Sequence, residues 1–215
     1  MTSRGAVQPA IGAPSVADAD RAAARAIRQL RAEGRHEAAC DRFDEIVRRH
    51  QRRASRIAFH YLRDAAEADD AVQDAFVRAF AGFDSFREEL SFEVWFTRIL
   101  INGCLDRLKA RKRRARWLGP LDAGPGPDGT TRPPMEPVAT DPAPEARVLA
   151  QEQRRRLTAA LARLPERQRA VFLLSQVEGY TAREVAELTG LSESTVRVHL
   201  FRAIRRLRAL LADER

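Results

Sequence analysis

Proline is concentrated in one part of this chain of 215 residues. Eight of the 11 prolines lie between residues 117 and 145, together with four glycines. Proline has no backbone N–H and interrupts both helices and sheet ladders, so a regular element cannot cross this stretch. An irregular segment of roughly 30 residues is also too long for an ordinary loop in a compact domain. We therefore expect two folded domains, joined by a flexible Pro/Gly-rich linker at residues 115–147.

The segment before the linker has the hydrophobic spacing of amphipathic helices. Its clearest run follows the i, i+3, i+4, i+7 rule and consists of Ala68, Ala71, Val72, Ala75, Phe76, Ala79, Phe80 and Phe83. A further helix is expected from Phe92 to about Leu108, and it leads into a basic run from Lys109 to Arg116. These patterns predict a small helical domain at residues 37–114, in a chain that we assign to the all-α class.

Two groups of side chains in this domain suit partners of different kinds. The polar face of the helix over residues 68–83 carries Asp69, Asp70, Gln73 and Asp74, which fits either a basic protein surface or an ordinary solvated face. The second group is aromatic, lies close to arginines and the basic run, and consists of Phe83, Phe86, Phe92, Trp95 and Phe96. Aromatic rings stack on unpaired bases with about 1–3 kcal/mol per contact, but rings at helical spacing also fit a hydrophobic core.

The segment after the linker has the pattern of a helix-turn-helix motif. Thr181 and Glu184 have the spacing of a capping box, and Gly190 is a typical residue at the end of a helix. The next helix, over residues 192–208, has an apolar face of Val196, Leu200, Ala203, Ile204 and Leu207. Its opposite face carries Arg197, His199, Phe201, Arg202 and Arg205. A basic second helix after a tight turn predicts that residues 148–215 bind the major groove of duplex DNA.

The residues before the first domain carry weaker signals. Ser15 and Asp18 fit the N-cap and the first turn of a short helix that extends to about Leu30. The apolar face of this helix is thin. We therefore expect residues 1–36 to be an N-terminal extension that is partly disordered or forms a short, loosely docked helix.

Charge and composition limit the function classes. The net charge of +8, from 38 Lys and Arg against 30 Asp and Glu, favours a polyanionic partner. The two cysteines and four histidines have no metal-ligand spacing, and neither a phosphate-binding glycine loop nor a nucleophile motif is found. We therefore expect no metal, no cofactor and no enzymatic activity. No apolar segment approaches the roughly 20 residues of a membrane span, which favours a cytoplasmic protein without membrane insertion.

Three sets of motifs together resemble the extracytoplasmic function (ECF) sigma factors, the small members of the bacterial sigma-70 family. Residues 67–76 look like region 2.2. Phe86-Arg87, followed by Phe92, Trp95, Arg98, Ile99, Asn102 and Asp106, looks like regions 2.3 and 2.4. Leu164-Pro165, Glu184-Val185-Ala186, Thr195-Val196-Arg197 and Arg202-Ala203 look like region 4. The resemblance covers about residues 37–114 and 148–210.

The resemblance implies a subunit that binds core RNA polymerase, reads promoter DNA and promotes its melting. It places Asp69, Asp70, Gln73 and Asp74 on the clamp helices of the β′ subunit, and region 4 on the β flap. For the −10 element it implies Phe86, Arg87, Phe92, Trp95, Arg98, Asn102, Lys109 and Arg111. For the −35 element it implies Thr181, Ser194, Thr195, Arg197, Val198, His199, Phe201, Arg202 and Arg205. The usual regulator in this family is an anti-sigma factor that covers regions 2 and 4.

Some features leave alternatives open. Val198 and His199 stand where Ser and Arg are common in the family, so the resemblance does not determine which −35 sequence is preferred. A stand-alone helix-turn-helix regulator would explain residues 164–208, but not the acidic face, the aromatic group or the basic run. An RNA-binding or anti-termination protein would use the aromatic group on single strands.

Overall fold

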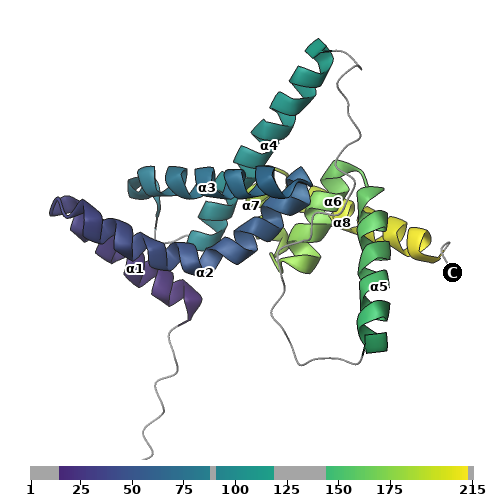
Figure 1. Cartoon of the computed structure of the whole chain (residues 1–215), viewed down its shortest axis with the longest axis horizontal. Coiled ribbons are helices and arrows are strands. Elements are labelled where there is room, and N and C mark those ends of the chain that lie inside the picture. The colour runs from purple at the N-terminus through teal and green to yellow at the C-terminus, as the bar shows by residue number, and fades with distance from the viewer. Residues whose placement is uncertain (1–14, 88–90, 119–143, 213–215) are drawn as a thin grey trace, which may run out of the picture.

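The computed structural model describes residues 15–87, 91–118 and 144–212 of the chain (Figure 1). Every regular element in these ranges is helical, which confirms the all-α prediction. The elements are, in order, α1 (Val16–Ala32), α2 (His36–Leu62), α3 (Ala65–Ala81), the 3-10 turn η1 (Phe83–Ser85), α4 (Phe92–Leu118), α5 (Pro144–Ala162), α6 (Glu166–Phe172), the π-helical turn η3 (Leu173–Val177), α7 (Ala182–Thr189) and α8 (Glu193–Ala212).

Helices α2, α3 and α4 form a bundle around an aromatic core. Asp64 caps α3, because its carboxylate accepts a hydrogen bond from the Glu67 N–H at 2.8 Å. The rings of Phe76 and Phe96 stack with centroids 4.3 Å apart, and Phe43 meets Phe76 edge-on. Most of the apolar run predicted over residues 68–83 is buried in this core. The hydrophobic spacing therefore identified the face by which α3 packs.

The N-terminal helix α1 packs along α2 more closely than its thin apolar face predicts. Ser15 caps it as predicted, since its hydroxyl accepts a hydrogen bond from the Asp18 N–H at 3.2 Å. Ile27 is completely buried against the bundle. The Asp20 carboxylate is buried as well, with Nε2 of His50 2.8 Å away. A polar pair and an apolar side chain together dock α1, and the sequence pattern revealed only the apolar part.

Helix α4 follows the predicted apolar spacing and extends through the basic run. It runs for 27 residues to Leu118 and includes the whole basic run. Its C-terminal half projects away from the bundle (Figure 1). Lysine and arginine are good helix formers, and Lys109 pairs with Asp106 on the preceding turn at 3.1 Å, so the run continues the helix instead of ending it.

Helical structure therefore extends into both ends of the predicted linker. Residues 115–118 belong to α4, and α5 begins at Pro144, where proline is tolerated because the first turn of a helix needs no N–H partner. The remaining linker residues, 119–143, lie outside those that the structure describes.

Helices α5 to α8 form the second helical unit. Helices α5, α6 and α8 enclose a small apolar cluster of Ala160, Leu161, Leu164, Leu173, Ala203 and Leu207. The other apolar residues of the unit are continuous with the core of α2–α4; they include Val171, Leu174, Val185, Leu188 and Val196. The two units therefore pack directly against each other, with α7 beside α4 (Figure 1).

Candidate nucleic-acid interface

The turn between α7 and α8 is held by the cap residues that the sequence predicts. The Thr181 hydroxyl accepts a hydrogen bond from the Glu184 N–H at 3.3 Å, and the Glu184 carboxylate accepts one from the Thr181 N–H at 2.8 Å. Gly190 ends α7 at a φ of 71°, a left-handed conformation that strains residues with a side chain. Ser192 then caps α8, since its hydroxyl accepts a hydrogen bond from the Thr195 N–H at 3.2 Å. The predicted capping box and glycine C-cap are thus confirmed.

Helix α8 buries one face and exposes the other. Val196, Ala203 and Leu207 are buried, as the apolar spacing predicts. The exposed residues of the predicted DNA-binding set on this helix are Ser194, Arg197, Val198, Phe201, Arg202 and Arg205. Phe201 is 67% exposed and Val198 is 45% exposed, so large apolar side chains stand among the cations.

Three further residues of the predicted −35 set have different surroundings. Thr181 is exposed at the start of α7, whereas Thr195 and His199 are half-buried. Nδ1 of His199 is buried and has no hydrogen-bond partner among the described residues. His199 is therefore less available to a ligand than the exposed residues beside it.

The aromatic group before and within α4 consists mainly of core residues. Phe86 and Phe92 are each 2% exposed, and their rings meet edge-on with centroids 5.6 Å apart. We expected both among the DNA-binding residues, but their rings pack with Phe83 in the aromatic core and are not presented to solvent. Trp95 is only half-buried, with its ring 5.2 Å from that of Phe86. In this group, Trp95 combines a core contact with an accessible surface.

The exposed polar residues of the predicted −10 set continue from Trp95 along α4. Arg98, Asn102 and Lys109 are exposed, and their spacing from Trp95 places them in one stripe of the helix. Arg111 is exposed on a different side, with its guanidinium 3.7 Å from the Glu67 carboxylate of α3. Arg87 is exposed at the end of the segment that precedes α4. The structure therefore brings four of the eight predicted −10 residues into one stripe of α4, whereas Phe86 and Phe92 are buried.

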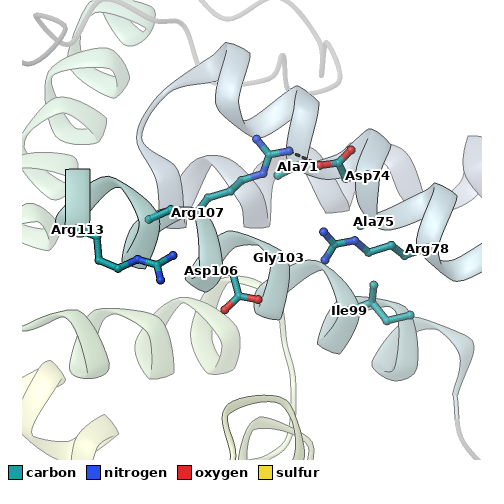
Figure 2. Close-up of a pocket in the computed structure, with 10 residues that line it drawn as sticks. Ala71, Asp74, Ala75, Arg78, Ile99, Gly103, Asp106, Arg107 and Arg113 are labelled. Carbon is teal, nitrogen blue, oxygen red and sulfur yellow. Dashed lines mark hydrogen bonds and ion pairs between the residues drawn. The ribbon is translucent and has the colours of Figure 1, made fainter. Parts of the chain in front are cut away.

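The acidic face of α3 is open to solvent. All of its predicted members are exposed: Asp69, Asp70, Gln73 and Asp74. Asp74 forms an ion pair with Arg107 of α4, and a cavity of about 370 Å³ lies beside this pair between the two helices (Figure 2). Arg78 of α3 and Arg113 of α4 extend over the cavity from opposite ends. The acidic face therefore borders directly on a basic edge of α4.

A buried ion cluster joins the two helical units, and the sequence did not predict it. The Glu178 carboxylate is 2% exposed and lies 3.1 Å from the guanidinium groups of both Arg53 and Arg56 on α2. Arg53 Nε has no hydrogen-bond geometry, so this approach is electrostatic, whereas Arg56 Nη2 donates a hydrogen bond to the carboxylate. Arg53 also lies 4.5 Å from the ring centroid of Tyr180, whose hydroxyl is 2.9 Å from the Thr97 hydroxyl on α4. Hydrophobic spacing cannot reveal pairs between such distant segments.

Burial shifts several pKa values around this contact. Together with the positive charge of Arg63, burial lowers the pKa of His60 to about 4. It raises the pKa of the Cys104 thiol to about 12 and also raises the pKa of Tyr180. Cys104 is a buried free thiol. In the described part of the chain, no group of three or more His, Cys, Asp or Glu residues could hold a metal ion.

Two family models match this chain. A family model described as Sigma-70 region 2 matches residues 46–114, and one described as Sigma-70, region 4 matches residues 154–207. The ECF RNA polymerase sigma factor SigM of Mycobacterium tuberculosis is 36% identical over 169 residues, which are 79% of this chain and 76% of SigM. This chain belongs to the ECF sigma factors. SigW of Bacillus subtilis is 29% identical to this sigma factor over 174 residues, which are 80% of the present chain and 90% of SigW.

Solved structures share the arrangement of helices in this sigma factor. CnrH, in complex with the cytosolic domain of CnrY, matches with a TM-score of 0.61 and 25% identity over 92% of this chain and 100% of CnrH. The sigma factor RpoE of Bartonella quintana, in complex with the anti-sigma factor NepR, matches with a TM-score of 0.60 and 25% identity over 80% of this chain and 98% of RpoE. Among the described helices of this chain, none is long and apolar enough to cross a bilayer.

Proposed function

We propose that this sigma factor directs core RNA polymerase to promoters through three separate surfaces. The acidic face of α3 binds the polymerase, the exposed stripe of α4 acts at the −10 element, and the exposed face of α8 reads the −35 element. The observation that carries this assignment is the separation of charge, with exposed carboxylates on α3 and exposed cations on α4 and α8. In this proposal residues 37–114 are the first domain and residues 148–215 are the second.

The polymerase contact consists of Asp69, Asp70, Gln73 and Asp74, bound to the clamp helices of the β′ subunit. Exposed carboxylates repel the phosphates of DNA, so this face suits a basic protein surface and not nucleic acid. Complementary charges increase both the rate and the specificity of protein association. The second domain makes a further contact with the β flap.

At the −10 element, the stripe of α4 contacts the non-template strand. Trp95 offers an accessible ring on which a base can stack, with Arg98, Asn102 and Lys109 along the same stripe. Extruding a base from a duplex costs a few kcal/mol, and stacking on an aromatic ring returns about 1–3 kcal/mol. Arg87 and Arg111 hold phosphates. Phe86 and Phe92 support this surface from the core, because their burial prevents contact with a base in this conformation.

At the −35 element, α8 enters the major groove. Arg197 and Arg202 suit guanine edges, and the apolar side chains of Val198 and Phe201 suit thymine methyl groups. Arg205, Thr181, Ser194 and Thr195 bind phosphates, which orient the helix on the duplex. The half-buried His199 supports the helix from its side.

We further infer that an anti-sigma factor regulates this chain in the cytoplasm, where the polymerase acts. The two solved relatives support this inference, because RpoE was solved with the anti-sigma factor NepR and CnrH with the cytosolic domain of CnrY.

Run-off transcription with bacterial core polymerase and a pool of promoter fragments tests the proposal. The wild-type chain is expected to give transcripts with defined start sites. Asp69→Lys combined with Asp70→Lys is expected to abolish them, whereas Glu187→Lys, at an exposed acidic residue of α7, is expected to retain them. Absence of transcripts together with tight duplex binding by the wild-type chain alone would favour the stand-alone regulator.

A further inference from the structure

Two arginines of α1 reach the segment that precedes α4. The Arg28 guanidinium donates a hydrogen bond to the backbone carbonyl of Phe86, and it lies 5.8 Å from the centroid of the Phe86 ring. Three residues further on, Arg31 lies 4.9 Å from the centroid of the Phe80 ring and 3.3 Å from the Asp84 carboxylate. Both arginines precede residue 46, where the match to Sigma-70 region 2 begins.

The helix that carries these arginines is fixed by contacts of its own. Asp20 is buried, forms an ion pair with Arg49 of α2 and lies 2.8 Å from Nε2 of His50. Ala24 and Ile27 are completely buried in the interface. The buried carboxylate and the apolar packing together fix the position of α1 against α2. The position of the two arginines beside η1 therefore follows from the docking of α1.

Phe86 connects α1 to the surface of α4. Its N–H donates to the Phe83 carbonyl at 3.1 Å, and its own carbonyl accepts from Arg28. Hydrogen bonds to a charged donor are roughly twice as strong as neutral ones, so Arg28 contributes substantially to holding this peptide in place. The Phe86 ring packs 5.2 Å from the ring of Trp95, and the next residue, Arg87, is exposed. A shift of the Phe86 backbone would therefore displace both Trp95 and Arg87.

The geometry points to Arg28 and Arg31 as positioning residues for promoter recognition. They hold the backbone from η1 to Phe86, and the Phe86 ring in turn sets the position of Trp95 at the −10 surface. In this assignment helix α1 contributes to recognition of the −10 element. The inference rests on the proposed function, because it needs the stripe of α4 to contact the −10 strand.

The test uses holoenzyme assembled from the full chain and core polymerase. The promoter is first identified by run-off transcription. Fluorescence anisotropy then measures binding of a labelled non-template strand that carries its −10 segment. A second labelled strand, in which that segment is scrambled, measures binding without the −10 sequence. Arg28→Ala and Arg31→Ala are compared with Arg21→Ala, at an exposed arginine of α1 that pairs with Asp18 two turns before Arg28. Affinity for core polymerase, affinity for a −35 duplex and the melting temperature are measured for each variant.

Arg28→Ala is expected to weaken binding of the correct strand about tenfold, which corresponds to about 1.4 kcal/mol, and to reduce its preference over the scrambled strand. Polymerase affinity and −35 affinity are expected to stay at the wild-type values. Arg28→Lys, which keeps the charge and a donor, is expected to recover part of the preference.

Two results would overturn the inference. One is a −10 preference for Arg28→Ala and Arg31→Ala equal to that of wild type. The other is a parallel loss of all affinities and of melting temperature, which would show a purely structural role. Failure of the proposed function looks different, because wild-type holoenzyme would then itself show no preference for the −10 strand.

Discussion

Replacing Glu178 by Gln tests the contact between the two domains. The substitution keeps the size of the side chain and one oxygen acceptor, but it removes the negative charge that faces Arg53 and Arg56. Breaking a fully buried ion pair by removing one partner costs about 3–5 kcal/mol. The Arg53 and Arg56 side chains are 26% and 42% exposed, so water can partly solvate the cations that remain. Arg53 also keeps its ion pair with Glu93. We therefore expect a loss of about 2–3 kcal/mol in the free energy of unfolding, which is less than for a fully buried pair.

Urea unfolding followed by circular dichroism measures this loss. Glu187→Gln is the matched control in the same domain, because Glu187 forms an exposed pair with Arg183 at 3.5 Å, and such surface pairs contribute about 0–1 kcal/mol. Small-angle scattering adds a second measurement, since a weakened contact should increase the radius of gyration of Glu178→Gln. Unfolding of Glu178→Gln at the wild-type urea concentration would contradict this expectation. So would a loss of stability in Glu187→Gln equal to that in Glu178→Gln.

Three further outcomes are expected. Arg202→Ala should weaken binding to a −35 duplex by about 1–3 kcal/mol if the side chain contacts a base, whereas Arg208→Ala near the end of α8 should weaken it less. If both variants bind the duplex with equal affinity in a titration, the DNA-reading face of the domain lies elsewhere. The free energy of unfolding should fall as the pH is lowered from about 6.5 to about 4, because in this range the unfolded chain binds a proton at His60 and the folded chain does not. In thermal melts at a series of pH values, His60→Gln should flatten this dependence. Asp64→Ala should cost about 1 kcal/mol by removing the cap of α3, and Asp64→Asn should restore most of it in the same urea assay.

Signals that act over a few residues predicted their structures well. The capping box of Thr181 and Glu184, the glycine at position 190 and the apolar stripe of α8 all depend on neighbours within one or two turns. Each was therefore readable from spacing. The family motifs added the order of the two domains, which spacing alone does not determine.

Features that depend on distant residues were not predictable in the same way. The Glu178 cluster joins segments more than 100 residues apart, and no periodicity marks it. Burial of Phe86 and Phe92 also depends on tertiary packing, since helical spacing describes a core ring and an exposed ring equally well. The docking of α1 depends on Asp20, a polar residue on a helix face that the hydrophobic pattern counted as weak.

The contact between the domains also affects how strongly this sigma factor can bind its targets. In the proposed function the two domains bind separate promoter elements, and an arrangement that needs them apart must first break this contact. Apparent affinity for a target that needs separated domains is the intrinsic affinity multiplied by the fraction of molecules in that state. Every 1.4 kcal/mol of contact energy lowers this fraction about tenfold. In the proposed function, the buried Glu178 contact therefore affects the protein concentration at which the promoter is occupied.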